Sequence, residues 1–408
     1  MIVIMLRKYL LVLLTLTLTL SVLFTGCTSN NDTNKETQEK LQNVMSLYSD
    51  FDGSVLVAKG DEVLLSSGYG NADHDKNIAN KPQTVFGIGS VTSQFTATAI
   101  MMLQEKNKLN IQDTVNKYIP DYPNGDKLKI YHLLTHTSGI PELYSHVDSI
   151  EIGKRTYTSA EVIDLFKNKP LNFDIGTKYE FSNSNYALLG YIIEKVSGMK
   201  YEDYIEQNIF KPLNMNNSGF LSNTKSTNDK SGIADRAIGY KKPVAKNTEL
   251  TEEKVAEPSI TYEKSIEAEP TLTYAAGGIY STVEDLYKWN KALNIGKLIT
   301  NESLKEMFTP HLENYGYGWF IDEKNTENDA EAADEHSDIS NSASSSIAND
   351  DHPKEADVVH HGGYLPGYSS FIIRDNTKHY VVIILSNTEY EKRAMDMGYY
   401  LLDALEEE

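Results

Sequence analysis

Near-continuous hydrophobic runs at both ends of the folded region predict the strands of a single sheet. Residues 54–58 and 63–66 are apolar stretches separated by a Gly-Asp turn, which is the pattern of a two-stranded hairpin. Near the other end, residues 379–385 are almost entirely apolar, as expected of a strand that is buried on both faces. The two ends of the chain are therefore expected to contribute strands to the same sheet.

Between these strands the apolar positions change to helical spacing. Phe95, Ala99 and Met102 form one stripe after Ser90. Further helices are expected from about residue 159, over 186–197 and over about 390–405, and a short amphipathic helix is expected over 41–48. Strands at both ends with helices between them predict an α/β fold, in which an antiparallel sheet is flanked by helices and a mostly helical subdomain spans about 89–274.

Two stretches do not follow a globular pattern. Residues 241–269 are charged and irregular, and residues 322–358 hold twelve Asp or Glu against two Lys, with almost no large apolar side chain. Such a segment buries too little apolar surface to order itself, so 322–358 is expected to be a disordered acidic insert. It carries about half of the formal net charge of −20. The acidic balance disfavours nucleic acid as a partner, because phosphate binding needs clustered Lys and Arg.

The N-terminus has the pattern of an export signal. Arg7 and Lys8 precede an uncharged run over 9–26, and the only cysteine of the chain, Cys27, follows a small residue. This resembles a bacterial lipoprotein signal, which implies a signal peptide over 1–26, lipidation of Cys27 and a polar, disordered tether over 27–40. The alternative is an uncleaved membrane span, since the apolar run is long enough to cross a bilayer.

Both readings place the domain over 41–408 outside the cytoplasmic membrane. The position of Cys27 and the polar tether favour the lipid anchor, so we expect a lipid-anchored, extracytoplasmic protein of a bacterial cell membrane, with the bilayer as a partner through Cys27. A single cysteine excludes a disulfide framework within the chain and a Cys-rich zinc site. We see no metal-ligand spacing, and we expect no cofactor.

Several segments carry the candidate chemistry. They are FGIGSVTSQF (86–95), LLTHTSGIP (133–141), YEFSNSNYALLG (179–190), AGGIYST (276–282) with Asp285, and HGGYLPGYSS (361–370). In this order and spacing they resemble the serine β-lactamase-related family, which includes penicillin-binding proteins and class C β-lactamase-like hydrolases. The resemblance covers roughly 38–405 and implies the β-lactamase/DD-peptidase fold.

The resemblance assigns roles to residues of the site. Ser90 stands at the nucleophile position, at the start of a helix whose dipole stabilises negative charge. Asn183 stands at the position that orients the substrate. His361 stands on the strand that forms the site wall and the oxyanion hole, and Gly363 and Tyr364 follow it as binding residues.

Two proton-handling positions depart from the family pattern. The lysine position is Ser93, whose hydroxyl cannot replace an amine as a base, and the tyrosine position is Phe181. We consider Tyr179, two residues earlier, as a partial substitute, and His361 as an alternative base. Two other Ser-x-x-Lys patterns, at Ser197 and Ser222, are rejected because one ends a helix and the other lies in a polar loop.

Three hypotheses about function follow. The first is a serine hydrolase that acts on an ester, an amide or a D-amino-acid peptide of the cell-wall type through Ser90, with weak or lost turnover. The second is a non-catalytic binding protein (a pseudoenzyme) that captures a cell-wall peptide or a protein partner in the same cleft. The third is a surface interaction module whose acidic insert binds the partner. The protein partner is not identified by the sequence.

Overall fold

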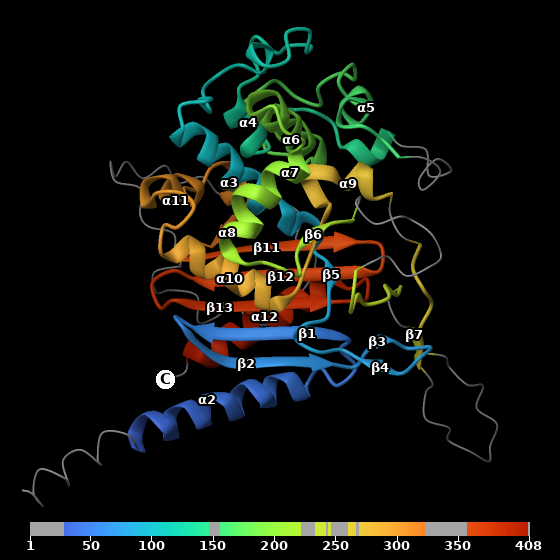
Figure 1. The fold of residues 1–408 in the computed structure, drawn as a ribbon, viewed down its shortest axis with the longest axis vertical. Coiled ribbons are helices and arrows are strands. Elements are labelled where there is room, and N and C mark those ends of the chain that lie inside the picture. The colour runs from blue at the N-terminus through green and yellow to red at the C-terminus, as the bar shows by residue number, and fades with distance from the viewer. Residues whose placement is uncertain are drawn as a thin grey trace, which may run out of the picture.

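The computed structural model describes residues 28–146, 156–221, 233–241, 244–245, 260–266, 269–322 and 357–406. In these residues a six-stranded antiparallel sheet carries helices on both faces (Figure 1). The strand order is β10-β11-β12-β13-β1-β2, so strands from the two ends of the chain pair in the middle of the sheet. The expected fold class, with one sheet built from both termini, is confirmed.

The bounds of the elements are as follows. The main sheet comprises β1 (Gly53–Lys59), β2 (Glu62–Tyr69), β10 (Phe320–Asp322), β11 (Val358–Leu365), β12 (Tyr368–Asp375) and β13 (Tyr380–Ser386). The short strands are β3 (Asn71–Asp73), β4 (Ile78–Ala79), β5 (Phe86–Gly87), β6 (Gly219–Phe220), β7 (Val244–Ala245), β8 (Ile260–Thr261) and β9 (Ile279–Ser281). The α-helices are α2 (Thr28–Ser46), α3 (Thr92–Glu105), α4 (Ile130–Leu134), α5 (Ser159–Asp164), α6 (Asn183–Ser197), α7 (Tyr201–Ile205), α8 (Lys211–Leu213), α9 (Pro270–Gly277), α10 (Val283–Asn294), α11 (Asn301–Met307) and α12 (Glu391–Glu406).

The central strands are apolar on both faces because each of them contributes side chains to two hydrophobic cores. In β1, Val55 and Val57 belong to the core beneath α2 and α12, whereas Leu56 and Ala58 belong to the larger core on the other face. All seven residues of β13 are buried. Side chains alternate between the faces of a sheet, so a strand covered on both sides reads as a continuous apolar run.

The layer formed by α2 and α12 covers one face of the sheet. Leu41 on α2 and Leu401 on α12 are fully buried in the same core. Helix α2 begins at Thr28, whereas the sequence predicted a disordered tether over 27–40 and a helix only from residue 41. Ion pairs one turn apart, Lys35 with Glu39 and Glu36 with Lys40, support this polar first part of the helix.

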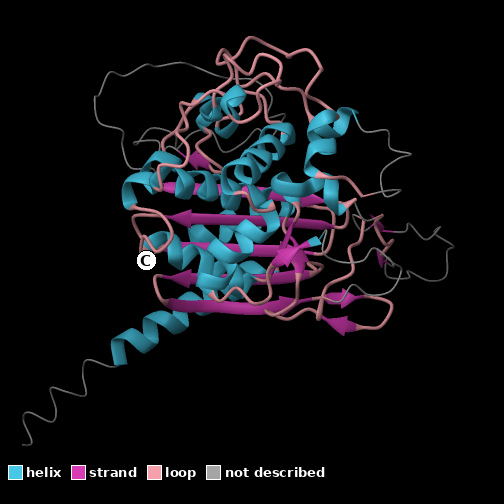
Figure 2. Ribbon diagram, turned by 45° about the horizontal axis from the view of Figure 1, so that its top comes forward, coloured by secondary structure: helices cyan, strands magenta, loops and turns pink. Residues whose placement is uncertain are grey.

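The helical part of the molecule lies over the other face and beyond the edge of the sheet at β10 and β11 (Figures 1 and 2). Its centre is the packing of α3, α6 and α9. Helix α6 ends at Gly198, which adopts a left-handed conformation with φ of 71°, and this agrees with the helix predicted over 186–197. Thr158 caps α5 and forms a capping box with Glu161. Helices continue past the predicted limit of 274, since α10 and α11 follow it.

Several predicted segments lie outside the described residues. Residues 1–27, with the predicted signal and Cys27, are among them, and so is the acidic insert except for its ends at Asp322, Asp357 and Val358. Of the irregular stretch 241–269, the structure describes a small hairpin of β7 and β8 and the residues that follow it. In the part of the chain that the structure describes, no helix combines the length and apolar character needed to cross a membrane.

Candidate active site

The nucleophile segment leaves the short strand β5 and enters α3 through a single 3-10 turn, Gly89–Val91. Ser90 lies in this turn and is half-buried, whereas Ser93 lies in the first turn of α3 and is 2% exposed. The helix is held firmly behind them. Phe95 stacks on Trp289 with ring centroids 4.2 Å apart, and Trp289 Nε1 donates a hydrogen bond of 3.1 Å to Gln94.

Strand β11 forms a wall directly against this turn. A Cβ atom at Gly363 would lie 2.1 Å from the backbone oxygen of Ile88 and 3.1 Å from the backbone nitrogen of Ser90, so only glycine fits. Ser370 of the neighbouring strand β12 donates a hydrogen bond of 2.7 Å to the same Ile88 oxygen. The structure therefore brings Ser90 and Gly363 together, and Tyr364 follows with a side chain that is 47% exposed.

His361 is buried on the same strand, and both ring nitrogens have partners. Its Nδ1 lies 2.5 Å from the backbone oxygen of Gly362, and its Nε2 lies 3.1 Å from the hydroxyl of Tyr315. A carbonyl oxygen only accepts, so Nδ1 carries the proton and Nε2 accepts from Tyr315. Burial lowers the pKa of His361 to about 4. His361 is therefore neutral at pH 7, and neither nitrogen is available to a substrate in this arrangement.

Phe181 packs beside a second buried histidine. Its ring centroid lies 4.5 Å from that of His136 and 6.4 Å from that of His361. Nδ1 of His136 lies 3.2 Å from the backbone N–H of Ser182 and 3.0 Å from Nδ2 of Asn185, so it accepts and the proton sits on Nε2. Burial, with His361 nearby, holds the pKa of His136 well below its usual value. Phe181, which stands at the tyrosine position of the family, therefore lies beside two neutral imidazole rings.

Tyr179 borders the same aromatic cluster. Its ring centroid lies 6.0 Å from that of His136 and 5.8 Å from that of Tyr315. Its hydroxyl oxygen is buried and makes no hydrogen bond within the described residues. Burial, with Tyr186 and Glu313 nearby, raises the pKa of Tyr179. A phenol in these surroundings is a poor proton acceptor, because its anionic form is destabilised.

Asn183 is the first residue of α6, and a carboxylate holds it there. The backbone N–H of Asn183 donates to Oε2 of Glu142 at 2.7 Å, and its side-chain Nδ2 donates to Oε1 at 3.1 Å. A negative charge is favourable at this end of a helix, since the first N–H groups have no partner within the helix. The side-chain oxygen of Asn183 is the part of the amide that remains to accept from a ligand.

Ser93 lies beneath the segment that contains Tyr315. A Cβ atom at Gly318 would lie 2.9 Å from the backbone oxygen of Ser93, so this segment rests closely on the first turn of α3. Ser90 in the nucleophile turn lies against the backbone wall of β11, and Asn183 begins α6, which packs against α3. Its two histidines are neutral and hydrogen-bonded, and Ser93 and Phe181 stand where the family has its proton-handling groups.

The sequence did not identify three residues of this site. Tyr315 and Glu142 were not singled out, and His136 entered only as part of the segment 133–141. The signal for Tyr315 was the dense run of glycines and aromatic residues over 315–320. Of the rejected serines, Ser197 ends α6 and accepts a hydrogen bond of 3.2 Å from the backbone N–H of Met199, while Ser222 lies outside the described residues.

Comparisons with known proteins agree with this geometry. The chain is 33% identical over 316 residues to a Bacillus subtilis (strain 168) protein whose name, PbpX, assigns it to the penicillin-binding proteins, and the match covers 73% of each chain. It resembles the crystal structure of a penicillin-binding protein from Bacillus halodurans, with a TM-score of 0.66 and 25% identity over 90% of this chain and 98% of that one. Its fold is also that of a D-amino acid amidase from Ochrobactrum anthropi SV3, with a TM-score of 0.68, 21% identity and coverage of 92% and 99%. The model of the family described as Beta-lactamase matches residues 45–406, and this chain therefore belongs to the β-lactamase family of serine hydrolase-fold proteins.

Proposed function

We propose that this protein is a membrane-anchored, extracytoplasmic member of the family that binds an ester, an amide or a D-amino-acid peptide of the cell-wall type beside Ser90, with weak or lost turnover. The observation that carries the proposal is the state of His361. His361 is the alternative base, since Ser93 and Phe181 stand at the proton-handling positions of the family, but burial lowers its pKa to about 4 and both nitrogens have partners. The penicillin-binding names of the relatives support the ligand class.

The chemistry that remains would run as follows. A carbonyl group placed against β11 would direct its oxygen to N–H groups of the nucleophile turn and of β11, with those of Ser90 and Tyr364 as candidates for an oxyanion hole. Ser90 Oγ would then bond to the carbonyl carbon while the C=O double bond opens to an oxyanion, and the serine proton would pass to water. The oxyanion would collapse to the Ser90 ester as the bond to the alcohol or amine breaks, and this leaving group would take a proton from water. Without an adjacent base the hydroxyl is a weak nucleophile. Loss of one such group typically costs several orders of magnitude in rate, and here two positions are changed.

The test measures acylation of Ser90 directly. We would incubate the purified protein with a fluorescent penicillin, beside the variants Ser90→Ala, Ser93→Lys, Phe181→Tyr and the double variant of the last two. We expect slow or no labelling of the parent and faster labelling of the double variant, all of it abolished by Ser90→Ala. Rapid Ser90-dependent labelling of the parent would reject the proposed loss of turnover.

A pseudoenzyme that only binds is the alternative within the same proposal. It predicts that an acyl-D-Ala-D-Ala peptide binds the parent and the Ser90→Ala variant with equal affinity and is recovered intact from both. Release of D-Ala by the parent, and not by Ser90→Ala, would favour the slow hydrolase instead. Both readings keep the cleft as the binding site.

The anchor is tested separately. Cys27 lies outside the described residues, so this part of the proposal rests on the sequence alone. We expect metabolic labelling with an alkyne fatty acid to modify the parent and not Cys27→Ala. A parent that is membrane-bound but carries no label would support an uncleaved span instead.

A further inference from the structure

A buried arginine lies between β12 and the ends of α10 and α11. Arg374 is 3% exposed, and its guanidinium packs against two aromatic rings, 5.3 Å from the centroid of Phe308 and 5.9 Å from that of Trp319. These two rings meet edge to face, with their centroids 5.5 Å apart. The aromatic faces attract the cationic head group, but they offer it no hydrogen-bond acceptor in place of water.

Two of the three guanidinium nitrogens have partners, and both partners are neutral amides. Nε of Arg374 donates a hydrogen bond of 2.8 Å to Oδ1 of Asn376, and Nη2 donates to Oδ1 of Asn294. Nη1 is buried and has no hydrogen-bond partner among the described residues. Burial lowers the pKa of Arg374 to about 9, and no neighbouring charge contributes to this shift. The side chain is therefore still cationic at pH 7, without a counter-charge in the described part of the chain.

A second buried donor in contact with Arg374 also lacks an acceptor. Trp319 is fully buried, and its indole Nε1 makes no hydrogen bond within the residues that the structure describes. A guanidinium and an indole N–H can only donate, so neither group satisfies the other. A buried charge without a counter-charge and a buried donor without an acceptor both cost free energy. The partner that matches both groups is an acceptor with a negative charge.

We infer that a small inorganic anion of halide size binds between Arg374 and Trp319, and that it accepts hydrogen bonds from Nη1 of the first and Nε1 of the second. Such an ion is close to a water molecule in size, so the site needs no room for an organic group. The inference goes beyond the proposed function and does not depend on it.

The anion would also stabilise the segment that supports His361. The backbone N–H of Gly316 donates to the oxygen of Trp319 at 2.8 Å, and the neighbouring Tyr315 holds Nε2 of His361. An anion that fixes Trp319 therefore fixes the short turn that carries Tyr315. Its effect on the molecule is expected to be a gain in stability that depends on the kind of anion and not on ionic strength alone.

The test uses chloride, with bromide as its heavier analogue, on the purified full-length protein in detergent. Thermal unfolding is followed while sodium chloride replaces sodium gluconate at constant ionic strength, because gluconate is too large for the site. Chloride at about ten times its dissociation constant is expected to raise the melting temperature of the parent by about 2 °C. Crystals soaked in bromide are expected to show its anomalous signal within hydrogen-bond distance of Arg374 Nη1 and Trp319 Nε1.

Two substitutions remove the two donors in turn. Arg374→Met removes the charge and keeps an unbranched side chain, and Trp319→Phe removes the N–H and keeps an aromatic ring. Chloride is expected to leave the melting temperature of Arg374→Met unchanged. It is expected to raise that of Trp319→Phe by less than that of the parent, because one of the two donors remains.

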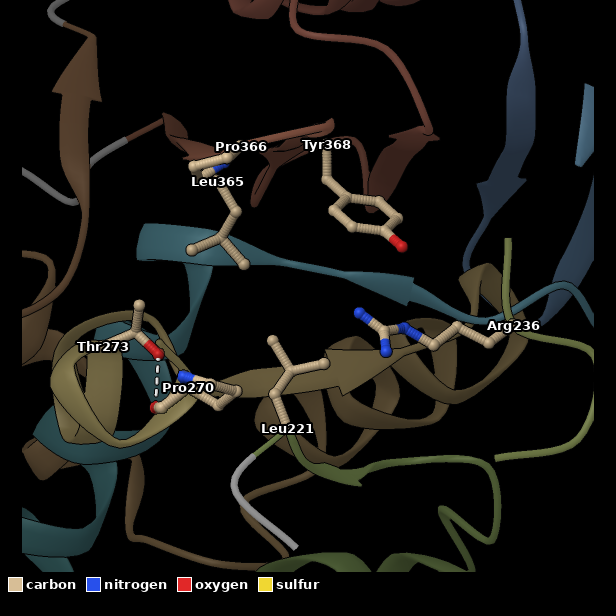
Figure 3. A pocket seen from close by; sticks show the side chains of 7 residues that line it. All are labelled: Leu221, Arg236, Pro270, Thr273, Leu365, Pro366 and Tyr368. Atoms are coloured by element: carbon tan, nitrogen blue, oxygen red, sulfur yellow. Dashed lines mark hydrogen bonds between the residues drawn. The ribbon is translucent and has the colours of Figure 1, made fainter. Parts of the chain in front are cut away.

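Arg236→Gln is the matched control, since Arg236 also lies over an aromatic ring, 5.8 Å from the centroid of Tyr368. Unlike Arg374, it is only half-buried, and it borders a small pocket that has space for about one water molecule (Figure 3). Loss of this guanidinium is expected to leave the response to chloride unchanged.

A parent that melts at the same temperature in chloride and in gluconate overturns the inference, since a water molecule would then suffice for the two donors. A response to chloride that survives Arg374→Met, or that disappears in Arg236→Gln, overturns it as well. If Arg374→Met does not fold, the bromide soak of the parent decides the question, and the absence of a signal at Arg374 rejects the site.

Discussion

The hydroxyl oxygen of Tyr315 lies 3.1 Å from Nε2 of His361, and both side chains are buried. The other nitrogen of His361 donates to the backbone of Gly362, so one proton arrangement is fixed for the whole pair. This hydrogen bond joins the segment before β10 to the wall of the candidate site. It also explains why His361 cannot accept a proton from a ligand, although it lies on the strand that forms the wall of the site.

Removing the Tyr315 hydroxyl tests this pairing. Tyr315→Phe keeps the ring but leaves Nε2 of His361 buried without a donor, which is expected to cost about 1–3 kcal/mol of unfolding free energy. It is also expected to raise the pKa of His361, because the lost donor stabilised the neutral ring. Denaturant unfolding measures the first effect, and NMR titration of the imidazole measures the second.

Tyr317→Phe is the matched control. Tyr317 lies two residues after Tyr315, and its buried ring stacks on His311, so this variant also removes one hydroxyl from a buried ring. We expect it to leave the His361 titration unchanged. An unchanged titration in both variants would show that Tyr315 does not hold His361.

Burial of His361 also predicts how stability depends on pH. The folded chain holds the pKa of His361 at about 4, below the usual value of 6.5. Between these values the unfolded chain binds more protons, so stability is complete above pH 6.5 and is lost as the pH falls toward 4. Across this window His361 contributes a loss of about 3 kcal/mol.

The measurement compares unfolding free energies of the parent and His361→Asn from pH 7 to pH 4. We expect the difference between them to change by roughly the amount that His361 contributes, while the exposed control His379→Asn follows the parent. A difference that is constant with pH would mean that His361 is not held neutral by burial. Carboxylates also titrate in this range, but they do so in all three proteins, so their effect cancels.

The contact between β11 and the nucleophile turn is tested by adding one methyl group. In Gly363→Ala the new Cβ would meet the backbone oxygen of Ile88 at 2.1 Å, so the strand must move away from Ser90. We expect ligand binding beside Ser90 to be lost, at a cost in stability of about 1–3 kcal/mol. Binding of the acyl-D-Ala-D-Ala peptide measures the first effect, and thermal unfolding measures the second.

Gly362→Ala provides the control on the same strand. Its Cβ points to the opposite face of the sheet and meets only the flexible end of Glu391, at 2.7 Å. This variant should therefore bind the peptide like the parent. If both variants bind equally well, the wall at Gly363 does not contribute to the ligand site.

Local patterns were sufficient for much of the scaffold. The apolar run of β13 predicted a strand covered on both faces, and Gly198 marked the end of α6 because only a left-handed residue closes the helix there. The juxtaposition of Ser90 and Gly363 followed from the segments that resemble the family. These features depend on neighbouring residues or on a motif, so they are visible along the chain.

The interactions that decide the chemistry were not visible in the same way. Tyr315 and His361 are 46 residues apart and are separated by the acidic insert, so no local periodicity relates them. The carboxylate of Glu142 reaches Asn183 across 41 residues. The pKa of His361 depends on complete burial, which a strand pattern does not specify. Polar residues 28–40 also lacked the apolar stripe that predicts a helix, yet they continue α2.

The hydrogen bonds from Asn183 to Glu142 give a prediction that a second substitution, at Glu142, should reverse. In the parent, Nδ2 of Asn183 lies 3.1 Å from Oε1 of Glu142. In Asn183→Asp a carboxylate oxygen takes the place of this amide donor. Two carboxylates at this separation repel each other, so the pKa of one is raised and the start of α6 loses stability. Because both groups are only half-buried, we expect a modest loss of about 1 kcal/mol at pH 7.

The double variant Glu142→Gln with Asn183→Asp should recover most of this loss, because the pair then again has one donor amide and one carboxylate. The sign of the pH dependence separates repulsion from a packing defect. Protonation of one carboxylate relieves repulsion, so the deficit of Asn183→Asp should shrink as the pH is lowered. Thermal unfolding of the four proteins at pH 7 and pH 4.5 measures the coupling, and a deficit that persists in the double variant would show that Glu142 does not hold Asn183 through charge.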